Sequence, residues 1–290
     1  MAKDLFGNEI IEDVLLRDKF IEPPFSVLNA KNGDWQRRKR QWKSVGIKSE
    51  VGRDATSFST AKSSKKYNYM PDVGSDTSVF DPALCELMYH WYCPENGEIL
   101  DPFAGGSVRG IVANYLGYKY TGIELRQIQV DHNREQAMDL LDITNQPNWY
   151  VGDSNDVLNG FNKEFDFVFS CPPYMDLEVY SDLPNDLSTM ADDDFIKVYE
   201  SIINKTCKLL KSGGMACFVV GDVRNKKNGG YKDFPSITKN AFKKAGLLLW
   251  NDCILLDPVG TAMLRANRTF IKGNGKLVKV HQNVLIFKKI

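Results

Sequence analysis

The sequence predicts an α/β fold, built on a mostly parallel, doubly wound sheet of seven strands with an antiparallel last strand. From about residue 80 onward, short apolar runs of strand length alternate with stretches of helical periodicity. This alternation is typical of a parallel sheet covered by helices on both faces. The last two strand candidates have no predicted helix between them, so we expect them to pair antiparallel.

Each element is predicted from its own run of residues. Strands are expected over 97–101, 119–124, 148–153, 165–170, 215–221, 247–256 and 282–289. Helices are expected over 81–92, 107–117, 125–140, 192–211 and 235–245. Two of these helices are expected to end at glycines, in KSGG at 211–214 and in KKAG at 243–246, because glycine favours the position after a helix.

Composition excludes several classes of protein but names no partner. The 290 residues include 37 Lys and Arg and 37 Asp and Glu, so the net charge is zero. There is no apolar run of about 18 residues and no basic-then-apolar leader, so we expect a cytoplasmic protein without a membrane span. Six cysteines without a CxxC pair predict reduced thiols, and three scattered histidines predict no metal site.

Residues 1–75 are predicted to form a basic N-terminal extension, and residues 76–290 the main domain. Between 31 and 66 there are eleven Lys and Arg and three acids, a local net charge of +8. The predicted nucleic-acid contacts in this extension are Arg37, Arg38, Lys39 and Arg40. Trp35 and Trp42 flank this run, and they could instead fix a helix to the core.

A glycine-rich turn follows the first strand of the regular region, in GEILDPFAGGSVRG at 97–110. It is not the dinucleotide fingerprint, because Ser107 stands where the second glycine would be. Asp101 precedes the turn and would repel a pyrophosphate, but it suits the ammonium of S-adenosylmethionine. Gly105 and Gly106 would let the backbone approach such a ligand closely.

Two further acids end the next two strands. Glu124 is placed to accept hydrogen bonds from ribose hydroxyls, and Asp153 to bind an adenine amino group. A single acid after a strand would as readily be a helix cap, but three in succession predict a nucleoside cofactor. The remaining predicted cofactor contacts are Phe103, Ala104 and Ser170.

The corner SCPPY at 170–174 follows the fourth predicted strand. Together with DPFAGG and the acid-ended second strand, it resembles the amino-group DNA methyltransferases, whose motif is (Asp/Asn/Ser)-Pro-Pro-(Tyr/Phe/Trp). The resemblance covers about 80–290, with weaker agreement in SGGMACFVVGD and VHQNVLIFKK. It implies a Rossmann-like methyltransferase fold, S-adenosylmethionine as cofactor and double-stranded DNA as partner, and leaves room for a cognate restriction enzyme.

The chemistry of amine methylation explains such a corner. The lone pair of an exocyclic amine is delocalised into the base, so two acceptors must hold its hydrogens and turn the lone pair toward the methyl group. The resemblance gives these roles to the side chain of Cys171 and the carbonyl of Pro172, with Pro173 stiffening the corner. Tyr174 would stack on a base flipped out of the duplex.

Cys171 departs from the usual motif, and serine is nearest to it in shape. This favours N4 of cytosine over N6 of adenine as the methylated atom. Cys171 could alternatively be a nucleophile, as in C5-methylating enzymes, although those carry Pro-Cys. It could also be a buried residue of a catalytically weakened nucleic-acid-binding module. RNA or a protein Gln amide remains an alternative substrate.

Three other segments are predicted to face DNA. Residues 175–194 are interpreted as a lid with Tyr180 as a second stacking group, or else as an acidic surface loop. Two loops, 222–235 and 257–276, are predicted to follow the phosphate backbone. Their basic residues are Arg224, Lys226, Lys227, Arg265, Arg268, Lys272 and Lys276. SVFDP at 78–82 resembles, weakly, the family segment near the methionine end of the cofactor.

Overall fold

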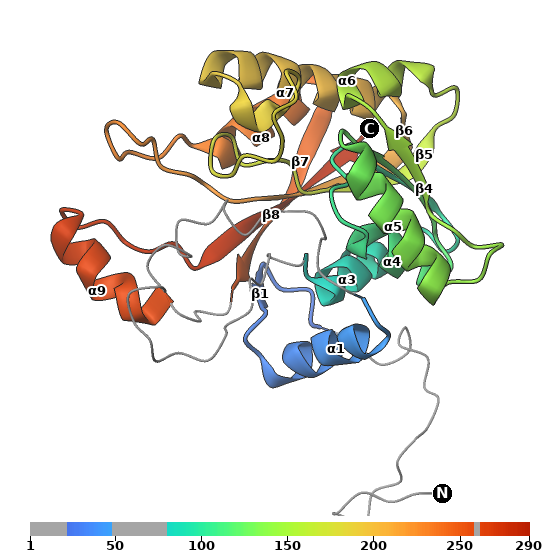
Figure 1. Ribbon diagram of the computed structural model, residues 1–290, viewed down its shortest axis with the longest axis horizontal. Coiled ribbons are helices and arrows are strands. Elements are labelled where there is room, and N and C mark those ends of the chain that lie inside the picture. Colours follow the sequence, from blue (N-terminus) through green and yellow to red (C-terminus); the bar gives the residue numbers. More distant parts are fainter. Residues whose placement is uncertain (1–21, 48–79, 258–261) are drawn as a thin grey trace, which may run out of the picture.

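The computed structural model describes residues 22–47, 80–257 and 262–290, with only the backbone described at 262–265 (Figure 1). The other parts of the predicted extension 1–75, and positions 78–79 of SVFDP, lie outside the described residues.

The described residues form one eight-stranded sheet (Figure 1). Its order is β4 (Asn148–Val151), β3 (Lys119–Glu124), β2 (Glu98–Asp101), β5 (Phe165–Ser170), β6 (Leu210–Val220), β8 (His281–Lys289), β7 (Leu247–Leu256) and β1 (Val27–Asn29). Only β8 runs antiparallel to its neighbours. The predicted fold class is confirmed, and β1 adds an eighth strand at the edge, parallel to β7.

Helices cover both faces of this sheet. One layer contains α1 (Gly33–Ser44), α3 (Pro82–Tyr92), α4 (Val108–Tyr115) and α5 (Gln127–Leu140). The other contains α6 (Ser154–Val157), η2 (Leu158–Gly160), α7 (Asp192–Lys208) and α8 (Phe234–Lys244). Alternate residues of β5 divide between the layers, since Phe167 and Phe169 join the first core and Val168 the second.

Two predicted features of the chain need correction. A helix, α9 (Ala262–Lys272), lies between β7 and β8, although these strands do pair antiparallel as expected. The KSGG stretch belongs to β6 instead of ending a helix, because α7 ends at Lys208 and the β5–β6 register shifts at this point. KKAG does end a helix, with Gly246 at a φ of +88° after α8.

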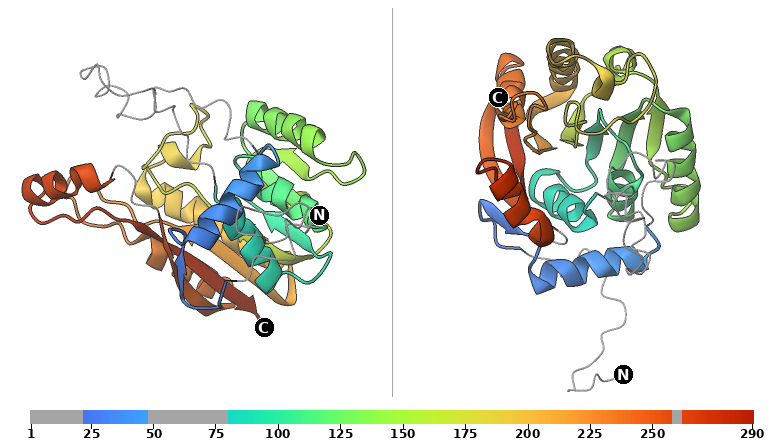
Figure 2. Two further views of the ribbon diagram at one scale, coloured as in Figure 1. Left: turned by 90° about the horizontal axis from the view of Figure 1, so that it is seen from below. Right: turned by 60° about the vertical axis from the view of Figure 1, so that its left-hand side comes forward.

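The N-terminal helix α1 packs into the core, against α3 (Figure 2). Trp35 and Trp42 are fully buried, which agrees with the alternative that they fix this helix in place. Arg38 is also buried, and its guanidinium pairs with Glu86 of α3, with an Nε–Oε2 distance of 2.7 Å. The predicted nucleic-acid contact at Arg38 is therefore wrong, because its charge is used inside the protein.

Some chemical features concern the chain as a whole. All six cysteines are reduced. Among the residues that the structure describes, no helix has both the length and the apolar character needed to cross a bilayer. Within the same residues, no three His, Cys, Asp or Glu side chains gather into a group that could hold a metal ion.

Candidate active site

A cavity of about 480 Å³ opens at the carboxyl ends of β2 and β5. These neighbouring strands form the switch point of the sheet, because the chain continues from β2 to one side and from β5 to the other. Open α/β sheets bind ligands at such a point. The loops after β2, β3, β4 and β5 all contribute to the cavity wall, so segments far apart in the sequence meet there.

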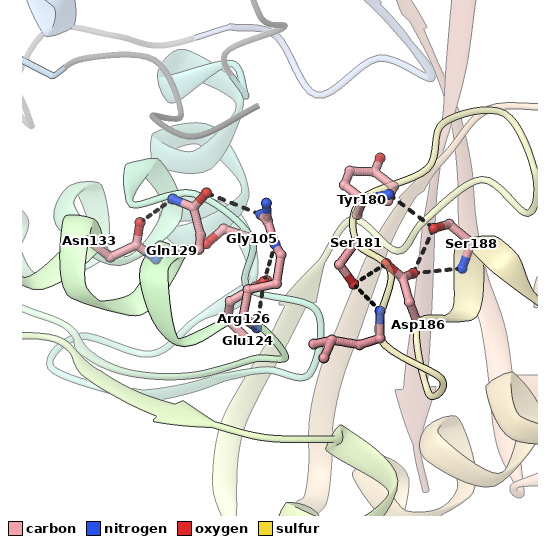
Figure 3. A network of polar contacts seen from close by, with 10 residues as sticks. Gly105, Glu124, Arg126, Gln129, Asn133, Tyr180, Ser181, Asp186 and Ser188 are labelled. Atoms are coloured by element: carbon pink, nitrogen blue, oxygen red, sulfur yellow. Dashed lines mark hydrogen bonds and ion pairs between the residues drawn. The ribbon is translucent and has the colours of Figure 1, made fainter. Parts of the chain in front are cut away.

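One end of the cavity is lined by Gly105 and Glu124, which a chain of polar contacts connects (Figure 3). Glu124 Oε1 accepts hydrogen bonds from the backbone N–H (3.1 Å) and Nε (2.9 Å) of Arg126. Arg126 donates to Gln129, Gln129 to Asn133, and Asn133 to the carbonyl of Gly105 at 2.8 Å. The glycine turn, with Gly105 at a φ of +52°, and the carboxylate after β3 are thus held in one network.

Phe103 and Asp153 line the same end of the cavity. Asp153 also caps α6, since its Oδ1 accepts from the N–H of Asn155 at 2.8 Å. Its Oδ2 accepts a longer hydrogen bond, 3.4 Å, from Asn185, which also lines the cavity. Asp153 therefore caps α6 and lines the cavity at the same time.

The prediction that Asp101 contacts the cofactor needs correction, because its carboxylate is fully buried and accepts hydrogen bonds from groups inside the protein. It accepts from Arg109 Nε (2.6 Å), Tyr120 Oη (2.7 Å), Ser170 Oγ (2.5 Å) and the N–H of Phe103 (3.1 Å). Neither Asp101 nor Ser170 lines the cavity, and the same holds for Ala104 and Gly106. Asp101, Ser170 and Ala104 are fully buried and bind residues that line the cavity or its support, through Phe103 and Arg109.

Arg109 of α4 is a site residue that the sequence did not reveal. Burial acts to lower the pKa of its guanidinium, but Asp101, Tyr120 and Cys171 together outweigh this and the pKa is raised, so the cation persists. Its Nη2 donates to the carbonyls of Phe103 (2.6 Å) and Ala104 (2.8 Å), which fixes the turn after β2. Arg109 lines the cavity and lies 4.6 Å above the ring of Phe80.

The corner after β5 faces the other part of the cavity. Cys171, Pro172, Pro173 and Tyr174 all line it. The Tyr174 ring rests on Gly221, where a β-carbon would come within 2.8 Å of Cε2. Its hydroxyl donates to Gln282 Oε1 at 2.7 Å and lies 3.4 Å from Cys171 Sγ. The cofactor-side acids and the corner therefore share one cavity.

Three more residues at this end differ from the prediction. Two of them were not predicted as site residues, and one was predicted to have another role. Gln282 of β8 and Asp257, directly after β7, line the wall beyond Tyr174. Lys39 of α1 was predicted to contact nucleic acid, but it lines the same cavity and pairs with Asp81 at 3.0 Å. No local sequence pattern marks these positions, since they meet only through the sheet order.

The segment 175–191 forms a wall of the cavity through Tyr180. It is organised around Asp186, a buried carboxylate that accepts from Ser181 Oγ at 2.7 Å and from the N–H of Ser188 at 2.9 Å (Figure 3). The N–H of Tyr180 donates to Ser188 Oγ at 3.1 Å. The predicted lid is thus an ordered loop, and α7 begins at Asp192.

The remaining predicted nucleic-acid residues lie outside the cavity. Arg37 and Arg40 are exposed on α1, and Arg37 pairs with Asp34 at 2.6 Å. Arg268 is exposed on α9, whereas the side chain of Arg265 is outside the described part of the chain. Contact of these residues with nucleic acid stays a prediction.

Comparisons with known proteins give information on the type of fold. No family model and no curated protein matches the chain. A candidate RNA methyltransferase from Pyrococcus horikoshii aligns with a TM-score of 0.50 and 15% identity, covering 88% of this chain and 99% of that one. TrmN from Thermus thermophilus aligns with a TM-score of 0.49 and 13% identity over 87% of this chain and 53% of its own, so this chain spans about half of it. The first likeness shows that this chain has a Rossmann-like methyltransferase fold.

Proposed function

We propose that this chain is an S-adenosylmethionine-dependent methyltransferase that modifies the exocyclic amine of a base in double-stranded DNA. N4 of cytosine is favoured over N6 of adenine, because Cys171 is closest to the serine form of the motif. The observation that carries the proposal is the shared cavity, which joins Gly105, Glu124 and Asp153 to the corner Cys171–Tyr174.

The residues at the first end of the cavity fit the cofactor. In the described chain the hydrogen bonds to Glu124 end on Oε1, which leaves Oε2 to accept from ribose hydroxyls. Asp153 offers an acceptor for the adenine amino group, and Gly105 presents backbone without a side chain. Asp81 and Arg109, which have opposite charges, also line the cavity and offer partners to the methionine ammonium and carboxylate.

When bound, the cofactor supplies a methyl group on a sulfonium, and the electrons of the broken C–S bond stay with sulfur. The corner holds the amine: Cys171 Sγ and the Pro172 carbonyl accept its two hydrogens, so that the nitrogen lone pair faces the methyl group. After the N–C bond forms, the nitrogen releases one proton to an acceptor of the corner or to water. The ring of Tyr174, held on Gly221, offers a face for the flipped base.

A group of basic residues, part of it next to the corner, supports nucleic acid as the substrate. We define it as Arg224, Lys226, Lys227, Lys276 and Lys279, with Arg268 and Lys272 of α9. Its two loops pack together, since Arg224 and Lys279 lie 3.9 and 5.9 Å from the ring of Tyr231. Lys226 Nζ donates to the carbonyl of Asp176 at 2.8 Å, two residues after Tyr174. α9 projects from the body of the protein, as an element that reaches toward a duplex would (Figure 1).

Replacing Arg268 or Lys272 by alanine is expected to weaken DNA binding to a similar degree on all sequences. If each contacts one phosphate, the slope of log K against log salt concentration falls by about 1 per residue. Fluorescence anisotropy over a range of salt concentrations measures this slope. Lys163→Ala is the matched control, because Lys163 precedes β5 and pairs with Glu98 at the amino ends of β5 and β2, whereas the cavity lies at their carboxyl ends. Equal slopes in all variants would exclude α9 from the interface.

Cys171→Ser is expected to retain methyl transfer within about tenfold of the parent rate, or about 1.4 kcal/mol in the barrier. A hydroxyl replaces the thiol as acceptor for one amine hydrogen, so the geometry is kept. Single-turnover rates on duplex DNA measure the change. Complete loss, together with a covalent adduct of the parent protein on fluorinated cytosine, would instead assign Cys171 as a nucleophile.

The proposal is tested by the mass of the product. DNA duplexes of varied sequence and, in parallel, RNA are incubated with the protein and isotopically labelled S-adenosylmethionine, then digested to nucleosides and weighed. N4-methylcytosine is the expected product. N6-methyladenine would show that the methylated base is adenine, while the type of reaction stays as proposed. Label that appears only in RNA, and is not reduced by competing duplex DNA, would overturn the choice of DNA.

A further inference from the structure

Four side chains connect the end of β7 to the SCPPY corner in an unbroken series of hydrogen bonds. Gln282 Nε2 donates to both oxygens of Asp257, at 3.0 and 3.2 Å. Gln282 Oε1 accepts from Tyr174 Oη at 2.7 Å, and Tyr174 Oη lies 3.4 Å from Cys171 Sγ. All four residues line the cavity.

The carboxylate at one end fixes the direction of every bond in this series. Asp257 can only accept when ionised, so the amide of Gln282 must turn its NH₂ toward Asp257 and its oxygen toward Tyr174. Tyr174 has one hydroxyl proton, and the 2.7 Å contact commits it to Gln282. Burial raises the pKa of Tyr174 well above its usual value, so this proton stays in place. Between Tyr174 and Cys171 the thiol must therefore be the donor.

We propose that Asp257 and Gln282 are positioning residues that turn the Cys171 thiol proton away from the substrate, leaving the sulfur lone pairs as an acceptor for the base amine. The inference rests on the proposed function, because it explains how Cys171 can accept a hydrogen bond from the base amine in that reaction. Without this direction, the thiol could point its proton at the amine. The amine hydrogen would then meet the thiol hydrogen instead of a sulfur lone pair that can accept it.

Several charged groups face Asp257 and affect its ionisation. Burial raises the pKa of this carboxyl, and Asp81 raises it further, whereas Gln282, Lys39 and His281 lower it. Lys39 comes from α1, Asp81 precedes α3 and His281 begins β8. An asparagine in place of Asp257 could accept from Gln282 through Oδ1 or donate to it through Nδ2, so it would no longer fix the direction of the bonds.

The direction is tested by Gln282→Glu, alone and combined with Asp257→Asn. Two facing carboxylates share one proton at lower pH, and the introduced glutamic acid, when protonated, then imitates glutamine. As pH rises that proton is lost and the two carboxylates repel each other, which displaces the introduced side chain from Tyr174. The kcat is then expected to fall about tenfold below the parent while cofactor affinity is unchanged. In the double variant, the introduced asparagine donates to the introduced glutamate, Tyr174 again has an acceptor, and kcat is expected to return.

Asp257→Asn alone leaves an amide that can turn either way, and is expected to lower kcat by about threefold, less than Gln282→Glu does at high pH. Gln282→Glu with the kcat of the parent at every pH would overturn the proposal. The same holds for a double variant that binds cofactor normally but does not recover, because the loss would then come from a misfit at position 282.

A second measurement does not depend on methyl transfer. Tyr174→Phe removes the acceptor of the thiol proton, so the pH midpoint for iodoacetamide alkylation of Cys171, followed by peptide mass mapping, is expected to move to lower pH. A midpoint that moves to higher pH would show that Tyr174 donates to sulfur, and would overturn the proposal. If the parent methylates no base, the proposed function fails while this measurement still tests the direction of the bonds.

Discussion

Replacing Asp101 with alanine is expected to lower the free energy of unfolding by about 3–5 kcal/mol. The change leaves the buried guanidinium of Arg109 without its anion and removes the acceptor of Tyr120 and Ser170. A buried charge that loses its partner is among the most costly changes in a folded protein. Urea unfolding followed by tryptophan fluorescence measures the loss.

Asp153→Ala is the matched control, because Asp153 also follows a strand but is partly exposed and caps a short helix. Its loss is expected to cost about 1 kcal/mol, the usual value for a helix cap. Similar losses in the two variants would contradict the structural role of Asp101. Asp101→Asn keeps the shape and one acceptor oxygen, and is expected to be less destabilising than alanine.

Gly221→Ala is expected to lower kcat about 100-fold with little change in cofactor affinity. A β-carbon at this position would lie 2.8 Å from Cε2 and 3.1 Å from Cδ2 of Tyr174, so the ring has to move. Displacement of a catalytic group by about 1 Å can cost about 100-fold in rate. Glu124 and Asp153 belong to other loops and remain in place. Single-turnover kinetics and calorimetric titration with cofactor separate the two effects.

Gly160→Ala provides the comparison, since a β-carbon there meets no atom within 4 Å. It is expected to have parent kinetics and near-parent stability. Full activity of Gly221→Ala would show that methyl transfer does not need Tyr174 at its observed place, and would weaken the assignment of the corner as the base site.

The sequence predicted the elements that have a clear apolar pattern. The bounds of β3, β5 and β7 agree with prediction because each is a short segment rich in apolar and aromatic residues that lies between polar or glycine-containing segments. Helix α1 was missed because WQRRKRQW has the composition of a basic surface. Its buried arginine is stabilised by Glu86, 48 residues away in the chain, and no local pattern reveals such a pairing.

The candidate site was predicted in outline and corrected in detail. Asp101 and Glu124, which end β2 and β3, and Asp153, two residues after β4, were found because each ends a predicted strand, and two of the three line the cavity. The third, Asp101, does not, because Arg109 lies in the first turn of α4 and captures it. That arginine was visible in GGSVRG and could have been considered as a partner. Gln282 and Asp257 could not be found, since the order of β6, β8 and β7 brings them to Tyr174.

The place of β8 in the sheet has a consequence for how the chain acquires its structure. β8 is later in the sequence than every other strand, yet it lies between β6 and β7. A nascent chain emerging from the ribosome therefore has no partner for the inner edge of β7, and leaves one edge of β6 bare, until β8 has been synthesised. Such long-range pairing slows folding and exposes unpaired strand edges to other chains. Association with a chaperone is accordingly expected to be stronger for a released chain truncated just before His281, which has β6 and β7 but lacks β8, than for the full chain.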